Sequence, residues 1–98
     1  MTQAIISMDG IGIESELDFH VRVAAALDSG PYYGKNLDAL WDMLSSGAGG
    51  GITLVWRNSE ESRQRLGSTF EKIVALFEKT KARERELALP GRFDYKLE

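Results

Sequence analysis

The run ITLVW at residues 52–56 constrains the fold of this chain more than any other feature. It is apolar and β-branched throughout, which is typical of a strand buried on both faces of a sheet. A second apolar run, QAIISM at residues 3–8, ends at Asp9-Gly10 and predicts another strand followed by a turn. Stretches with helical periodicity lie between and after these runs. Strands separated by helices predict an α/β fold with a small parallel sheet and helical crossovers.

Three to four helices are expected, and polar residues mark where they begin. Ser15 and Asp18 resemble a capping box, with Asp in place of the usual Glu. Asn36 is a suitable N-cap for a second helix, and Asn58 or Ser59 for a short polar helix that Gly67 ends. The predicted core stripe of the first helix contains Leu17, Phe19, His20, Val21, Val23, Ala24 and Leu27.

The C-terminal third of the chain predicts one long helix and up to two strands. The helix extends from about residue 69 to residue 85, with Phe70, Ile73, Val74 and Phe77 facing the core. The segment ELAL at residues 86–89 is the expected third strand of the sheet. After a turn at Pro90-Gly91, alternation at residues 92–97 indicates an extra strand, which could run antiparallel, or a tail.

Composition restricts the chemistry that the chain can support. The 98 residues fit a single domain over residues 1–98, and the lack of cysteine excludes disulfides and thiolate metal sites. No metal or cofactor is expected. There is no apolar run long enough to span a membrane and no signal-peptide pattern, so a cytoplasmic location without membrane contact is expected.

Charge is unevenly distributed along the chain, whose net charge is −3. Residues 1–50 hold seven acidic and two basic side chains, giving −5, whereas residues 51–98 hold eight acidic and ten basic ones, giving +2. An acidic N-terminal half repels nucleic acid and favours a basic partner. The basic residues of KTKARERE alternate with acids, which is typical of a solvated helix surface.

The second helix combines a core stripe with a pair of acids. Leu37, Leu40 and Leu44 recur at helical spacing, and Asp38 and Asp42 lie side by side on a neighbouring face. Trp41 falls between the two groups, so one edge of its ring can be packed and the other exposed. Like charges four residues apart cost roughly 0.2–0.5 kcal/mol in an isolated helix. Local stability therefore does not require this pair.

Aromatic residues gather at the start of the same helix. Tyr32 and Tyr33 precede it, and Gly34 permits close approach of the backbone. Taken alone, the acids could be ordinary solvated surface and the tyrosines could cap the core. Together, aromatic side chains with adjacent charges are typical of a protein-binding hot spot.

The run YYGKNLDALWDML at residues 32–44 resembles the signature of the barstar family, differing from it only at Lys35 and Met43. The resemblance continues through ITLVWR and LFEKTKA and covers about residues 1–89, with the tail GRFDYKLE beyond it. It implies a three-stranded parallel sheet packed against helices in two or three layers. It also implies a monomer that forms a 1:1 complex with a basic ribonuclease, either barnase-like or a toxin nuclease, and blocks its active site.

The resemblance also implies which residues would contact that ribonuclease. Asp42 matches the aspartate that occupies the enzyme's phosphate pocket, and Tyr32 matches the tyrosine that packs over its catalytic histidine. The full set of implied partner-binding residues is Tyr32, Tyr33, Gly34, Asn36, Leu37, Asp38, Trp41, Asp42, Ser45, Gly47 and Lys79. A ribonuclease site is lined with Arg and Lys, and a carboxylate can substitute there for phosphate.

Three residues depart from the family pattern. Lys35 and Lys79 stand where glutamates would lie, and Gly47 stands where an interface tryptophan would lie. These changes lower the negative charge at the rim of the surface and remove one aromatic side chain that would anchor a partner. They favour a different cognate nuclease, or weaker cross-binding, over loss of the function.

Three other functions compete with ribonuclease inhibition. The paired carboxylates could serve in glycoside hydrolysis, but nothing indicates an apolar pocket to raise either pKa, so an enzyme is not expected. Direct RNA binding would need flanking charges of the opposite sign. A barstar-like adaptor with a non-nuclease partner stays open.

Two other features do not indicate a site. His20 lies in an apolar arc and is interpreted as a packed structural residue. Gly49-Gly50-Gly51 precedes a strand, whereas a phosphate-binding loop precedes a helix.

Overall fold

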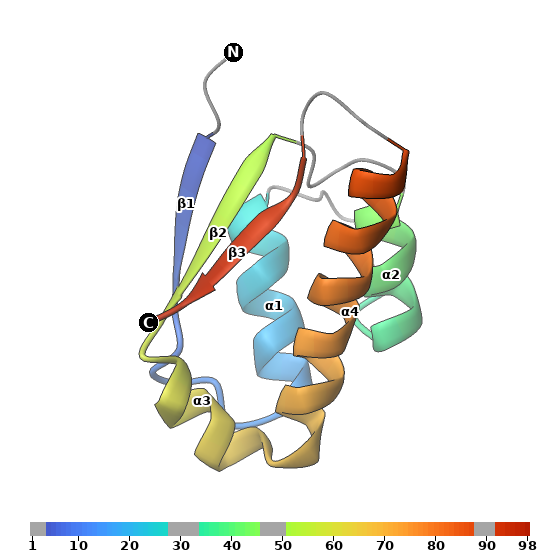
Figure 1. The fold of residues 1–98 in the computed structure, drawn as a ribbon. Helices are drawn as coiled ribbons and strands as arrows, with labels where there is room; N and C mark the ends of the chain where they lie inside the picture. Colours follow the sequence, from blue (N-terminus) through green and yellow to red (C-terminus); the bar gives the residue numbers. More distant parts are fainter. Residues whose placement is uncertain (1–3, 28–33, 46–50, 88–91) are drawn as a thin grey trace.

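A computed structural model describes residues 4–27, 34–45, 51–87 and 92–98 of the chain. Three strands and four helices occur in these ranges, in the order shown in Figure 1. Their bounds are β1 (Ala4–Asp9), α1 (Glu16–Leu27), α2 (Leu37–Ser45), β2 (Ile52–Arg57), α3 (Ser59–Leu66), α4 (Ser68–Glu86) and β3 (Asp94–Leu97). The predicted α/β class is confirmed.

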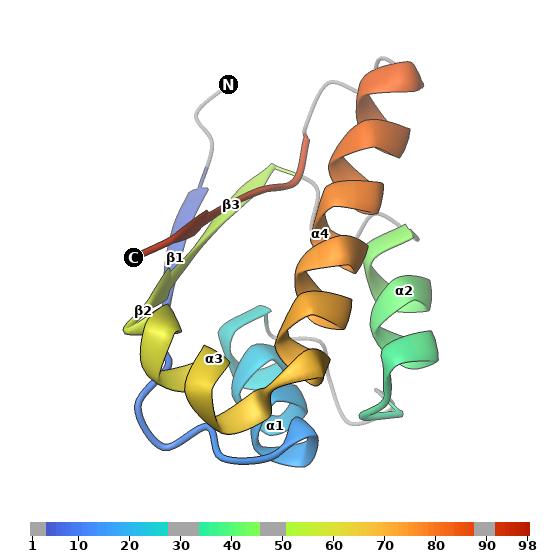
Figure 2. The same cartoon turned by 60° about the horizontal axis from the view of Figure 1, so that its bottom comes forward.

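The sheet has the order β1-β2-β3, and all its strands are parallel. Ala4 pairs with Ile52 at one end of β1, and Thr53 pairs with Asp94 at the start of β3. The helices gather on one side of the sheet, and α2 lies beside α4 on the side away from the sheet (Figures 1 and 2). A three-stranded parallel sheet against helices is the arrangement that the sequence predicts.

The third strand differs from the prediction in position and direction. Glu86 is the last residue of α4 and Leu87 follows as its C-cap, so the predicted strand at 86–89 is wrong at these two residues. Ala88 and Leu89 lie outside the described residues. β3 instead lies in the C-terminal segment and is parallel to β2, not antiparallel. The parallel direction of β3 follows from α4. The 19 residues of this helix extend about 28 Å and carry the chain back to the end of the sheet at which β2 begins, so β3 starts at the same end as β2.

The two faces of β2 have different surroundings. Leu54 and Trp56 are fully buried against the helices. Thr53 lies on the helix-free face and is only half-buried, and its partner on β1, Ile5, is 73% exposed. The prediction that β2 is buried on both faces is therefore wrong for this face, although Val55 is buried there. Burial on two faces requires helices on both, and the described helices cover one.

The core-facing side of α1 also differs from the prediction. Phe19, His20, Val23 and Leu27 are buried, whereas Leu17 and Val21 are 57% and 50% exposed. Because the apolar arc of α1 is broad, the sequence did not determine which side of the helix faces the core. Packing against the aromatic core determines it. The rings of Phe19 and Trp56 stack with centroids 5.2 Å apart.

The aromatic core is centred on Trp56. Its ring packs against Phe70 and Phe77 of α4, with centroid distances of 5.1 and 6.3 Å. Its indole N–H donates to the hydroxyl of Ser62 at 3.1 Å, so the buried polar edge is satisfied. Ile73 is buried as predicted, whereas Val74 is only partly buried.

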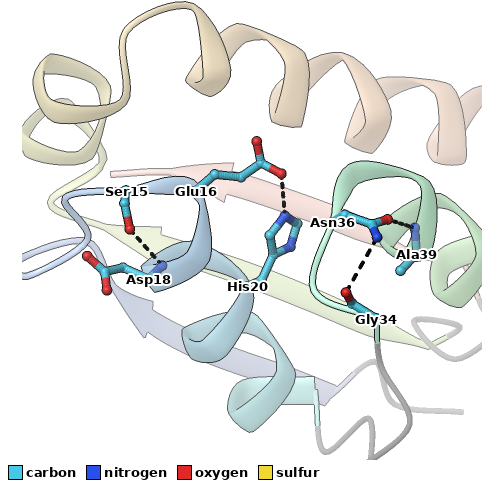
Figure 3. Close-up of polar contacts among 7 residues, drawn as sticks. All are labelled: Ser15, Glu16, Asp18, His20, Gly34, Asn36 and Ala39. Carbon is cyan, nitrogen blue, oxygen red and sulfur yellow. Dashed lines mark hydrogen bonds and ion pairs between the residues drawn. The ribbon is translucent and has the colours of Figure 1, made fainter.

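His20 is fully buried, as expected for a structural histidine. Its Nε2 lies 2.9 Å from a carboxylate oxygen of Glu16, one turn earlier in α1 (Figure 3).

At the start of the same helix, the Asp18 N–H donates to the Ser15 hydroxyl at 3.2 Å. The Asp18 carboxylate accepts from the N–H of Glu14 instead of from Ser15, so the predicted capping box is present in altered form.

Asn58 precedes α3 at the predicted N-cap position, but its side chain does not cap the helix. The amide donates instead to the Asp9 carboxylate at 2.9 Å, which links the ends of β1 and β2. The Ile11 backbone N–H also donates to this carboxylate. The hydrogen bonds from Ile11 and Asn58 hold the pKa of Asp9 below its ordinary value of 3.8.

The C-terminal strand is joined to α4 by polar contacts. The Phe93 N–H donates to the buried carboxylate of Glu84 at 2.7 Å, and the Tyr95 hydroxyl donates to Glu78 at 2.6 Å. Burial is the main cause that raises the pKa of Tyr95 above its ordinary value, and the hydrogen bond to Glu78 is the second.

Within the described ranges, no helix is long and apolar enough to cross a membrane.

Candidate protein-binding site on α2

α2 is attached to the molecule by one apolar side and by a contact from Arg83 of α4 at its C-terminal end. Leu40 and Leu44 are fully buried and Leu37 is partly buried, as the helical spacing predicts. At the start, the Asn36 side chain accepts the Ala39 N–H at 2.7 Å, which confirms the predicted N-cap (Figure 3). The helix axis runs beside α4 and in the same direction (Figure 2).

The opposite side of α2 presents the acidic pair. Asp38 and Asp42 are both exposed, and neither forms an ion pair with any residue that the structure describes. Trp41, which the helical spacing places between the leucines and the acids, is partly buried, which agrees with the prediction of one packed and one open edge. Two adjacent carboxylates without cations are able to bind a positively charged group from another molecule.

Gly34 and Lys35 form the entry to α2. A Cβ added at Gly34 would lie 3.1 Å from the Ala39 Cβ, so the close approach that the glycine permits is to this helix. Lys35 has φ of 55°, in the left-handed region that residues with a Cβ rarely adopt. The Asn36 amide donates to the Gly34 carbonyl at 3.4 Å (Figure 3). The predicted residues Tyr32 and Tyr33 lie outside the described part of the chain.

The far end of α2 holds Ser45. Its hydroxyl donates to the Asp42 carbonyl at 3.4 Å, within the same helix. Its carbonyl accepts from the Arg83 guanidinium of α4 at 3.0 Å, which places a cation at the negative end of the helix dipole. The predicted residue Gly47 lies outside the described ranges.

Lys79 joins the site from α4. Its ammonium nitrogen lies 4.2 Å from the centre of the Trp41 ring, a cation–π contact between the two helices. A shallow groove of about 370 Å³ follows this contact, lined by Leu37, Asp38, Trp41, Lys72, Ala75, Leu76 and Lys79. The prediction from the sequence did not include Lys72, Ala75 or Leu76. The signal that could have found them is their helical spacing from Lys79.

No group of three or more potential metal ligands occurs among residues 4–27, 34–45, 51–87 and 92–98. On the surface formed by α2 and α4, a short capped helix presents exposed carboxylates beside a half-buried indole, a composition that is typical of protein-binding sites.

Comparison with known proteins identifies the family of the chain. Residues 3–95 match the family described as Barstar (barnase inhibitor), so the chain belongs to that family. The match extends past residue 89, where the resemblance was expected to end, and includes the start of β3. The chain is also 37% identical over 73 residues to the Bacillus subtilis (strain 168) protein titled "Putative ribonuclease inhibitor YrdF". That similarity covers 74% of this chain and 80% of the relative.

Proposed function

We propose that this chain inhibits a ribonuclease by placing α2 across the enzyme's active site. The observation that carries the proposal is the exposed Asp38–Asp42 pair, which forms no ion pair with a described residue and lies on a helix capped by Asn36 and bonded to α4 at its C-terminal end. In the complex, the Asp42 carboxylate takes the position of a substrate phosphate among the Arg and Lys side chains of the nuclease. Asp38 adds a second negative charge one turn earlier, where the helix dipole favours it.

The remaining contacts position this carboxylate. Trp41 contributes an apolar anchor, and Leu37 and Asn36 hold the first turn in place. We assign further contacts to Tyr32, Tyr33, Gly34, Ser45, Gly47 and Lys79 on the strength of the family resemblance. The protein acts as a monomer in a 1:1 complex, performs no catalysis itself, and protects the cell that produces the nuclease.

An inhibition titration tests the proposal. The purified protein is added to barnase and to any ribonuclease encoded beside its gene, and RNA cleavage is followed. We expect stoichiometric inhibition of at least one enzyme at micromolar concentration or below. If the protein inhibits none of them at that concentration, the function is not ribonuclease inhibition, and an adaptor role with another partner replaces it.

Asp42→Ala tests the assigned residue. We expect inhibition to weaken at least about thirtyfold, because truncation leaves the enzyme's phosphate-binding cations unpaired. The free energy of unfolding should change by less than about 0.5 kcal/mol, since the side chain is exposed. Glu86→Ala is the matched control, because Glu86 is an exposed acid at the end of α4 with no ion pair to a described residue. Equal inhibition by both variants would remove Asp42 from the mechanism.

A further inference from the structure

α4 separates its charges by face. The dipeptide Glu-Lys occurs at residues 71–72 and again at 78–79, and a separation of seven residues is close to two helical turns. The two glutamates face other elements: Glu71 lies 4.0 Å from Arg63 of α3, and Glu78 accepts the Tyr95 hydroxyl of β3. Lys72 and Lys79 both line the groove beside α2. The side of α4 toward α2 is therefore basic.

Neither groove lysine has a carboxylate partner among the described residues. Lys81, by contrast, lies 3.1 Å from Asp94 and 3.9 Å from Glu78. Asp38 lines the same groove as Lys72 and Lys79, yet it forms no ion pair with them. Lys79 is held over the Trp41 ring instead, which leaves its charge available at the surface. The binding surface thus has an acidic side on α2 and a basic side on α4.

We propose that this groove receives an acidic segment of the inhibited ribonuclease. The inference rests on the function proposed above and specifies the enzyme that the chain fits. A carboxylate of the enzyme pairs with Lys79 or Lys72, and an apolar neighbour packs on Trp41 and Leu76. The cognate ribonuclease therefore carries an acidic patch beside its basic active site.

Charge complementarity supports this occupant. A uniformly basic enzyme surface would bring Arg and Lys side chains against Lys72 and Lys79, and like charges across an interface disfavour binding. The two lysines therefore select against ribonucleases whose basic surface extends across α4. A patch with both signs of charge satisfies both sides of the inhibitor at once.

The test uses the ribonuclease that the titration identifies and the double variant Lys72→Glu/Lys79→Glu. We expect its affinity to fall at least about tenfold, because two attractive charges become repulsive. The matched control is Arg57→Glu/Lys96→Glu, which changes the net charge equally on the helix-free face of the sheet. Its affinity should remain within about twofold of wild type, because distant charges are screened by salt. Circular dichroism establishes that both variants are folded.

Double-mutant cycles then identify the partner group. Acidic surface residues of the ribonuclease are changed to their amides one at a time and combined with Lys79→Gln. We expect at least one of them to couple to Lys79, so that the second change costs little once the first is made. If Lys72→Glu/Lys79→Glu binds as tightly as wild type while Asp42→Ala loses binding, the acidic-segment inference is overturned and ribonuclease inhibition stands. If the protein inhibits no ribonuclease, both proposals fail.

Discussion

Lys35 adopts a backbone conformation that its own Cβ disfavours. Lys35 has φ of 55° and lies immediately before Asn36, where the chain turns into α2, the proposed binding helix. A left-handed conformation costs a residue with a Cβ about 1–2 kcal/mol, and glycine avoids most of this cost. Such strain is common next to functional sites, where the surrounding contacts determine the geometry. Here the Asn36 cap and the Gly34 contact on Ala39 provide those contacts.

We expect Lys35→Gly to stabilise the protein by about 0.5–1 kcal/mol, because relief of the strain exceeds the added chain entropy. Urea denaturation measures the change. Lys72→Gly is the matched control, since the same substitution inside α4 should cost about 1 kcal/mol. Destabilisation by Lys35→Gly would show that the lysine side chain makes a contact worth more than the strain.

At the scale of elements, α2 depends on its surroundings. It has 9 residues, and isolated helices of this length are marginal in water. The Asn36 cap supports its first turn, and the buried pair Leu40 and Leu44 and the Arg83 contact to Ser45 hold it against the rest of the molecule. The acidic pair is therefore held in a defined position in the free protein, so the proposed binding to a ribonuclease does not require the helix to form first.

We expect Asn36→Ala to lower the free energy of unfolding by about 1 kcal/mol, because the Ala39 N–H loses its acceptor. Urea denaturation measures this loss, and hydrogen exchange at Ala39 shows whether the first turn of α2 opens. Asn36→Asp serves as the control, because it keeps the capping oxygen. An equal loss in both variants would mean that the amide, through its bond to Gly34, matters more than the cap.

At the scale of the whole molecule, the C-terminal segment completes the fold. β3 pairs with β2, and Phe93, just before it, is 1% exposed and packs on Phe77 with ring centroids 5.4 Å apart. Glu84 accepts the Phe93 N–H, so the polar backbone at the entry to β3 is satisfied in the interior. Residues 92–98 are thus part of the sheet layer. The alternation in the sequence allowed either a strand or a tail here, and the structure has the strand.

We expect Phe93→Ala to cost about 3–5 kcal/mol, because it leaves a cavity against Phe77. A domain of this size has about 5–15 kcal/mol of stability in total, so thermal unfolding should shift clearly downward. Leu97→Ala is the control: Leu97 is 42% exposed, and its loss should cost less than about 1 kcal/mol. Similar small losses for both variants would show that this segment contributes little to the core.

The predictable part of the site lies within single elements. Asn36 as a cap, the burial of Leu40 and Leu44, and the adjacency of Asp38 and Asp42 all follow from spacing along one helix. The helical spacing of Lys72 from Lys79 places both on one side of α4, but whether that side lines the groove depends on how α4 packs against α2. The same applies to the contact of Lys79 with Trp41, which joins residues far apart in the chain.

The sequence by itself determined the α/β class, the approximate bounds of most helices, and the acidic face of α2. These features depend on local periodicity, on capping and on residue type, all of which can be read from neighbouring positions. Only the tertiary structure decided which side of α1 is buried, that β3 is parallel to β2, and that α4 turns two lysines toward α2. The physical reason is that each of these outcomes depends on packing between segments distant in the chain, where several arrangements satisfy the same local pattern.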